Sequence, residues 1–163
     1  MLGSLHWICA SAALLLAAAV FARRKGTASH RTLGWIYVAC MLILNAAALG
    51  VYQITGIWGP FHWLALVSLA TLCAGMLPAI RRSAGRWQTG WLGYHSHFMA
   101  WSAIGLAAAG ASQLAVQIYP NWYAVILATG LTMVSGSWLI RRHIPGAIRA
   151  GRPRSAGPGP GAE

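Results

Sequence analysis

The histidines are the side chains best suited to chemistry near neutral pH, because imidazole titrates there and also binds transition metals. The sequence has six histidines among 163 residues, and its single acidic residue is Glu163. His6 and His62 each stand at the start of a long apolar run and are followed directly by Trp. His30 and His95 each follow a basic segment and precede another apolar run. Two imidazoles on different helices can occupy both axial positions of a haem iron.

Haem b is therefore our first hypothesis for a cofactor, with His6/His62 and His30/His95 as two pairs of iron ligands. A haem also needs small neighbours for close approach and cations near its propionates. Arg31, Arg24 and Arg82 lie on the same side as His30 and His95, whereas the side of His6 and His62 has no charged partner. Small residues within the apolar runs include Gly34, Ala39, Gly75, Gly105 and Ala109. Such a chain would be a redox-associated membrane subunit.

Two alternatives to haem remain open. Histidine, Trp and Tyr at helix ends suit the membrane–water interface, because one part of the ring is apolar and the other is wet. On that hypothesis the chain is an accessory or scaffolding membrane protein. The third hypothesis is a small carrier or metal-handling protein, since soft ligands suit Cu(I) and Cys73, Met76 and Met99 are candidates. Scattered methionines and cysteines are more often packing residues.

His97 is expected to differ from His95. Residues two apart on a helix point about 200° apart, so these two histidines do not form a chelate. We expect His95 to face inward, His97 to face the lipid headgroups, and Trp101 to lie on a face of its own.

The shortage of carboxylates excludes several function classes. Glycosidase chemistry and Glu-assisted zinc hydrolysis both need a carboxylate inside the folded body, and a proton-coupled carrier usually needs one in the membrane. We therefore do not expect a stand-alone enzyme. Cys9, Cys40 and Cys73 are widely spaced within apolar runs, which is typical of buried small hydrophobes rather than of a disulfide framework.

The elements that position these residues are membrane-spanning helices. The sequence is 58% hydrophobic and 8% charged, whereas soluble domains have about 25% charged residues. Each apolar run is long enough to cross a bilayer as a helix. The sequence thus predicts an all-α integral membrane protein, with one transmembrane domain over residues 1–142 and a disordered basic tail over 143–163. The predicted spans are about residues 5–22, 33–54, 61–80, 95–118 and 121–140.

The basic residues predict the orientation of the spans. All twelve Lys and Arg residues lie in residues 23–32, in residues 81–94 or in the tail from Arg141. Basic connections stay on the cytoplasmic side, so the N-terminus is expected outside and the C-terminus in the cytoplasm of a bacterial inner membrane. The first span is expected to be retained, because its charges follow the apolar core instead of preceding it.

The same charges predict the partners. Short basic clusters between spans fit anionic lipid headgroups at the cytoplasmic surface. They do not form the continuous basic face that nucleic acid requires, so no nucleic acid is expected. A larger membrane complex is the other expected partner.

An internal repeat relates the first four spans. Residues 5–16 resemble residues 61–72, since both begin apolar-His-Trp, and each such span ends in an Arg-Arg pair that is followed by a loop, a histidine and a further span. The repeat predicts two helical hairpins that pack as a four-helix bundle, with one histidine pair at each end. The fifth span stands apart.

Three stretches carry a resemblance to a known family. They are KGTASHRTLGWIYV (25–38), GPFHWLALVSLATL (59–72) and WLGYHSHFMAWSAIGL (91–106). With them, about residues 1–118 resemble a bacterial family of polytopic membrane proteins classed as a domain of unknown function. The matching positions are His30, Arg31, Gly34, Tyr37, His62, His95, Met99, Trp101 and Ser102.

The chain departs from the family pattern at Ala103, where an aromatic residue is usual, and near Gln113, where an acid is frequent. The resemblance implies a polytopic membrane fold but no activity. The histidine layout is similar to that of di-haem b-type membrane cytochromes, which is an analogy of architecture.

Overall fold

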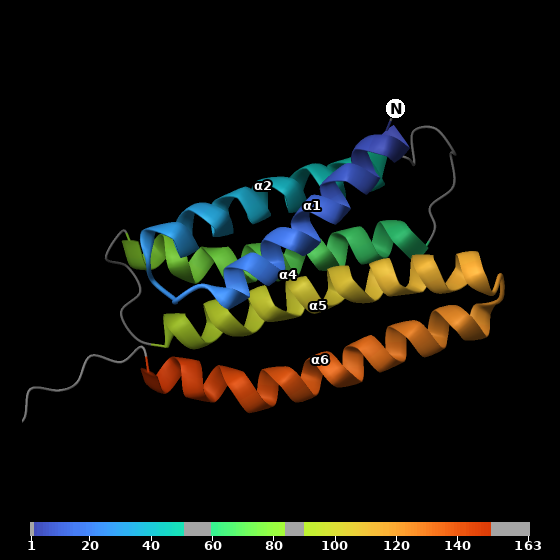
Figure 1. The fold of residues 1–163 in the computed structure, drawn as a ribbon. Coiled ribbons are helices and arrows are strands. Elements are labelled where there is room, and N and C mark those ends of the chain that lie inside the picture. Colours follow the sequence, from blue (N-terminus) through green and yellow to red (C-terminus); the bar gives the residue numbers. More distant parts are fainter. Residues whose placement is uncertain (1, 51–59, 84–89, 151–163) are drawn as a thin grey trace, which may run out of the picture.

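Five long helices make up most of the described part of the chain. The structure, a computed structural model, describes residues 2–50, 60–83 and 90–150. The helices are α1 (Leu2–Ala22), α2 (Ala28–Gly50), α4 (Pro60–Ser83), α5 (Trp91–Ile118) and α6 (Trp122–Ala150) (Figure 1). Each contains a segment long and apolar enough to span a membrane. The predicted all-helical fold with five spans is confirmed.

Several helices extend beyond the apolar runs that predicted them. α2 begins at Ala28, because the Thr27 hydroxyl accepts a hydrogen bond from the His30 backbone N–H at 3.3 Å and caps the polar first turn. α5 begins at Trp91, after Gly90 in a left-handed conformation. α6 continues to Ala150, into the segment expected as tail. A hydropathy profile does not detect these additional turns, because a helix requires hydrogen-bonded backbone groups but does not require apolar side chains. As a result, His30 and His95 lie inside helices.

Two further expectations fall on residues outside the described part. The last residues of the predicted second span, 51–54, belong to the undescribed segment 51–59, and the end of the tail, 151–163, is also undescribed.

The first four helices contact each other in a ring. α1 packs against α2 and α5, and α4 packs against the same two helices, so α2 and α5 occupy opposite corners of a bundle. α6 packs against α5 outside this ring (Figure 1). The four helices of the ring are those of the two predicted hairpins, and the repeat that relates the hairpins stays a prediction from the sequence.

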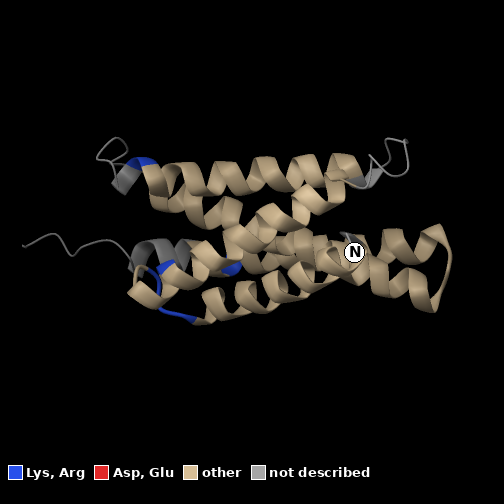
Figure 2. Cartoon of the chain, turned by 90° about the horizontal axis from the view of Figure 1, so that it is seen from above, with Lys and Arg blue, Asp and Glu red and all other residues tan. Residues whose placement is uncertain are grey.

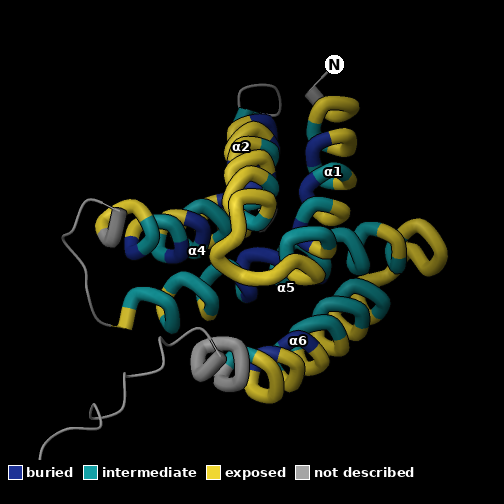
Figure 3. Tube along the Cα trace, turned by 60° about the vertical axis from the view of Figure 1, so that its left-hand side comes forward, coloured by how far each residue is buried: buried dark blue, intermediate teal, exposed yellow. Residues whose placement is uncertain are grey.

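The core of the bundle is built by these four helices. It contains Ala13 of α1, Met41 of α2, Leu72 of α4 and Ala103 of α5, among other residues. The exposed residues lie on the sides of the helices that face away from the core (Figure 3), and many of them are large and apolar. An apolar exterior is normal for a surface in contact with lipid.

α6 approaches α5 closely at one glycine. A Cβ added to Gly136 would lie 2.6 Å from Ile104 Cγ2, so only the bare backbone fits against that side chain. Gly136 is accordingly buried at this contact between α5 and α6.

The described Lys and Arg residues gather at one end of the helices (Figure 2). We call this the basic end; it carries the loop between α1 and α2 and the ends of α4 and α6. The residues are Arg23, Arg24, Lys25, Arg31, Arg81, Arg141 and Arg142. The structure thus brings the separate basic segments to one side, while the side of the membrane that they face stays a prediction.

Cysteine labelling tests that orientation. Ser29→Cys places a thiol at the exposed basic end, and Tyr119→Cys places one in the exposed connection at the other end, each in a chain whose native cysteines are replaced by alanine. With a membrane-impermeant maleimide on intact cells, we expect only the Tyr119→Cys chain to react. Both should react after permeabilisation, and labelling of Ser29→Cys alone in intact cells would reverse the orientation.

Candidate functional site

His95 lies near the start of α5 and is held by a backbone carbonyl of α4. Its Nδ1 lies 2.9 Å from the carbonyl oxygen of Gly75. A carbonyl oxygen only accepts hydrogen bonds, so His95 Nδ1 carries the proton and donates it. The lone pair of the neutral ring is then on Nε2. Histidines that bind metals are commonly oriented in this way, by a carbonyl or carboxylate that accepts from the other ring nitrogen.

Gly75 allows this contact because it has no side chain. A Cβ there would lie 2.9 Å from Met99 Sδ and 3.2 Å from the Met99 backbone nitrogen. Met99 follows His95 by one helical turn, so the same close approach of α4 and α5 brings the Gly75 carbonyl to the His95 ring. We had expected Gly75 to leave room for a cofactor. It admits Met99 instead.

Pro78 lies in the same turn of α4. A proline inside a helix removes the hydrogen bond to the carbonyl four residues before it, here that of Ala74, and crowds that carbonyl. The turn around Gly75 is therefore less tightly closed by its own helix. This makes a carbonyl bond to a neighbouring helix easier to form.

His30 lies in the first turn of α2, opposite His95. The Thr27 hydroxyl that caps this turn also donates to the Arg24 carbonyl at 2.9 Å, which ties the loop to the helix start. The His30 side chain is half-buried. Its Nδ1 is buried and makes no hydrogen bond of normal geometry with a described residue, although the Val20 carbonyl of α1 lies close enough to act as a weak acceptor. A buried ring nitrogen without a partner is unfavourable unless something binds it.

The structure brings His30 and His95 within electrostatic reach of each other. The Lys25 ammonium is within reach of both rings. Lys25 donates to the carbonyls of Val20 and Phe21 at 3.3 and 3.2 Å, at the end of α1. Loss of hydration at this position lowers the pKa of the Lys25 ammonium. The site therefore combines two imidazoles with the Lys25 ammonium, and no acidic side chain among the described residues neutralises the charge of that ammonium.

A buried hydrogen bond joins the same two helices deeper in the bundle. The hydroxyls of Tyr37 on α2 and Ser102 on α5 lie 2.9 Å apart. Each residue follows its histidine by seven positions, which is about two helical turns. The hydroxyl pair therefore lies about two turns deeper in the bundle than the histidines, within a core that is otherwise mostly apolar.

The other predicted site residues are not brought together in the same way. Arg31 follows His30 at the basic end and is exposed. His6 is half-buried on α1, and His62 is buried near the start of α4. These two histidines lie on α1 and α4, which occupy opposite corners of the ring, as α2 and α5 do. The pair His30/His95 has the contacts described above, while the pair His6/His62 stays a prediction from the sequence.

The soft-metal hypothesis gains no support from the described residues. They contain no group of three or more His, Cys, Asp or Glu side chains placed to hold a metal ion. Cys9, Cys40 and Cys73 are free thiols, and Met99 and Met76 pack against the hydrophobic core.

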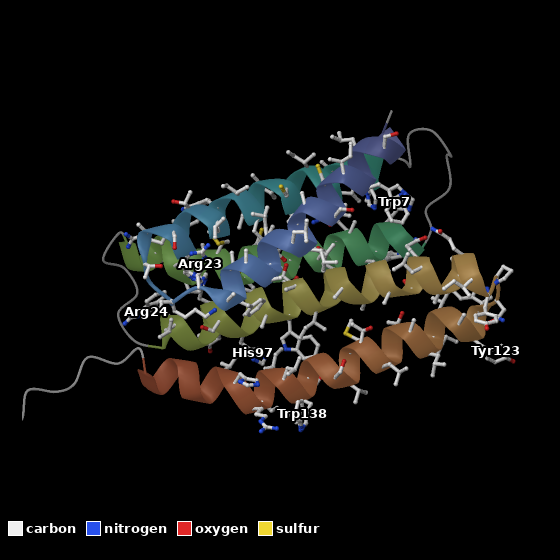
Figure 4. All side chains as sticks on the ribbon, viewed as in Figure 1. Trp7, Arg23, Arg24, His97, Tyr123 and Trp138 are labelled. Carbon is white, nitrogen blue, oxygen red and sulfur yellow. The ribbon has the colours of Figure 1, made fainter. Side chains whose placement is uncertain are left out.

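We had expected His97 to face the lipid headgroups and had not foreseen its neighbour. The Trp101 indole N–H donates to His97 Nε2 at 3.0 Å, so these two residues share a face of α5 one turn apart. Our expectation of a separate face for Trp101 was wrong. In Figure 4 the His97 side chain lies between α5 and α6, away from Arg23 and Arg24.

Lys25 and the pairing of Tyr37 with Ser102 were not expected at this site from the sequence. One signal was present: His30/Tyr37 and His95/Ser102 have the same seven-residue spacing in the two hairpins. The Gly75 carbonyl has no such signal, because backbone groups carry no residue type.

Comparison with known proteins gives one match. A family model described as "Predicted membrane protein (DUF2306)" matches residues 3–146, which include all five candidate spans. Neither the curated proteins nor the solved structures gave a match.

Substitution of Gly75 tests the helix contact that holds His95. Gly75→Ala forces the Met99 backbone away, and we expect destabilisation by about 1–3 kcal/mol, measured by thermal unfolding in detergent. The matched control is Gly105→Ala on α5, where a Cβ meets nothing within 4 Å. That control should be neutral or slightly stabilising, because alanine favours helices over glycine. Equal effects of the two substitutions would contradict the assignment.

Proposed function

We propose that this chain, which belongs to the DUF2306 family of predicted membrane proteins, binds haem b through His30 and His95 at the basic end of its bundle. In this proposal it is a redox-associated membrane subunit. The membership confirms the resemblance predicted from the sequence, and the chain is a predicted multi-pass membrane protein with five candidate spans. The family supplies no activity, so the proposal is based on the site.

The observation that carries the proposal is the state of the two rings. His95 donates through Nδ1 to the Gly75 carbonyl, which leaves Nε2 as the nitrogen able to bind iron. His30 Nδ1 is buried and makes no hydrogen bond of normal geometry with a described residue, although the Val20 carbonyl lies beside it as an acceptor. The rings belong to opposite corners of one bundle and are within electrostatic reach. Paired histidines on facing helices are a common way to hold haem in a bundle.

The surroundings of the pair also suit haem. Lys25 is within electrostatic reach of both rings, and Arg31 and Arg24 are exposed at the same end, where they can meet propionates. A Cβ at Gly34, one turn beyond His30, would meet nothing within 4 Å, so open space lies beside this part of α2. When bound, the iron supplies one-electron transfer. The residues of the chain orient the rings, exclude water and balance the propionate charge.

The proposal for partners follows from the basic end. Arg142 lies over the Trp138 ring, 5.0 Å from its centroid, which places a cation and an interfacial aromatic side by side. We infer that anionic lipid headgroups contact this end in a bacterial inner membrane. A redox subunit also needs an electron partner, which fits a larger membrane complex.

An absorption spectrum tests the proposed function. Protein purified in mild detergent from haem-replete cells should show a Soret band and, after reduction, the sharp α band of a low-spin haem. His30→Ala and His95→Ala should each lose the low-spin signature, because one axial ligand is removed. His97→Ala is the matched control on α5 and should leave the spectrum unchanged.

A colourless preparation, with no Soret band, would contradict the haem proposal. If His30→Ala and His95→Ala also folded and bound their membrane partners normally, the histidines would be interfacial and the chain an accessory protein. Stoichiometric copper or zinc in elemental analysis of a colourless protein would support the metal-handling alternative instead.

A further inference from the structure

We propose that the hydrogen bond between Tyr37 and Ser102 is the positioning contact that keeps His30 and His95 at the same depth in the bundle. The inference rests on the proposed function, because it concerns the geometry of the same pair. It assigns to Tyr37 and Ser102 the role of setting the helix register, with no contact to the cofactor itself.

The first argument is the spacing on two parallel helices. Both α2 and α5 start at the basic end and run in the same direction (Figure 1). Tyr37 follows His30 by seven residues, and Ser102 follows His95 by seven. Seven residues are about two turns, so each hydroxyl lies nearly in line with its histidine. Joining the hydroxyls at 2.9 Å therefore also sets the histidines level with each other.

The second argument is the position of the two helices in the bundle. α2 and α5 occupy opposite corners and are not among the helix pairs that pack extensively. Side-chain packing between neighbours therefore does not set their relative depth directly. The long side chain of Tyr37 crosses the interior, and both partners are almost fully buried, each with 3% of its surface exposed.

The third argument is that this bond completes a set of links among three helices. α5 is joined to α4 by the bond from His95 to the Gly75 carbonyl. α2 is joined to α4 by Asn45, whose Nδ2 donates to Ser68 Oγ at 3.2 Å. The Tyr37–Ser102 bond supplies the remaining side of this triangle. With all three sides in place, none of the three helices can slide without breaking one of these hydrogen bonds.

The energetics separate a positioning role from a purely stabilising one. Hydrogen bonds between membrane helices contribute little to stability on average, because the separated helices find other partners. Loss of the Tyr37 hydroxyl should therefore change stability little. A slip of α2 against α5 would still move one histidine out of level with the other, so the histidine geometry should change much more than the stability.

The test measures that geometry without any cofactor. Spin labels on Ser29→Cys of α2 and His97→Cys of α5, both exposed, report the distance between the two helices by pulsed EPR in nanodiscs. The background chain has alanine at the native cysteines. We expect a single narrow distance distribution with Tyr37 and Ser102 intact. Tyr37→Phe, and separately Ser102→Ala, should shift it or replace it with a broad distribution.

The matched control is Ser112→Ala, which removes a hydroxyl from the same helix. Ser112 donates to the carbonyl of Ala109 within α5, so this substitution breaks no contact between helices. Its distance distribution should equal that of the parent chain. An unchanged distribution in both Tyr37→Phe and Ser102→Ala would overturn the inference, whatever the result for haem.

A second measurement separates this inference from the proposed function. In chains with native histidines, Tyr37→Phe should convert part of the low-spin haem signal to a high-spin signal, with little change in the unfolding temperature of the apo-protein. A colourless parent protein would overturn the haem proposal, and the EPR distances would then decide the positioning role alone. A coloured parent whose Tyr37→Phe variant keeps both the low-spin signal and the narrow distances would overturn the positioning role alone.

Discussion

The hydrocarbon interior of a bilayer offers no water to hydrogen-bond with, and every polar group within the spans must find a partner inside the protein. This constraint explains why each span is a helix and why the buried polar side chains occur in contacts. His95 bonds to a backbone carbonyl, Tyr37 to Ser102, and Asn45 to the Met41 carbonyl at 2.8 Å as well as to Ser68. With almost no acidic residues in the chain, hydroxyls, amides and carbonyls serve as the partners. His30 Nδ1, in the first turn of α2, is buried without a hydrogen bond of normal geometry to a described residue, beside the Val20 carbonyl.

The arrangement of helices divides the protein into a site-bearing part and an added part. The ring of α1, α2, α4 and α5 contains the hydrophobic core and carries His30 and His95, whereas α6 packs against α5 outside the ring. The contact of Gly136 with Ile104 attaches α6 to the face of α5 that does not carry His95's bond to α4. α6 thus lies outside the ring that surrounds His30 and His95, although it packs closely against α5, the helix that carries His95.

The two hairpins treat their histidines in a similar way. The His95 ring bonds to the carbonyl of Gly75 on the preceding helix α4, and the His30 ring lies beside the carbonyl of Val20 on the preceding helix α1. When His6 is aligned with His62, Val20 and Gly75 fall within one position of each other. The repeat itself stays a prediction from the sequence. The two hairpins differ at this contact, because Gly75 has no side chain and the His95 ring lies 2.9 Å from its carbonyl oxygen.

The sequence by itself determined the helical class, the five spans, the gathering of basic residues at one end and the histidines worth testing. These features follow from composition and from the order of apolar and charged residues, which act locally along the chain. The tertiary structure alone decided that His95 bonds to Gly75, that His30 keeps a buried nitrogen without a hydrogen bond of normal geometry to a described residue, that Lys25 joins them, and that Tyr37 meets Ser102. Such contacts depend on how deep each helix sits and how it is rotated against its neighbours. A small slide or rotation of a helix leaves the hydropathy of its buried and lipid-facing surfaces nearly unchanged, so hydropathy cannot specify these contacts. Close packing at a glycine and a short hydrogen bond do depend on the depth and rotation of each helix, and they can specify them.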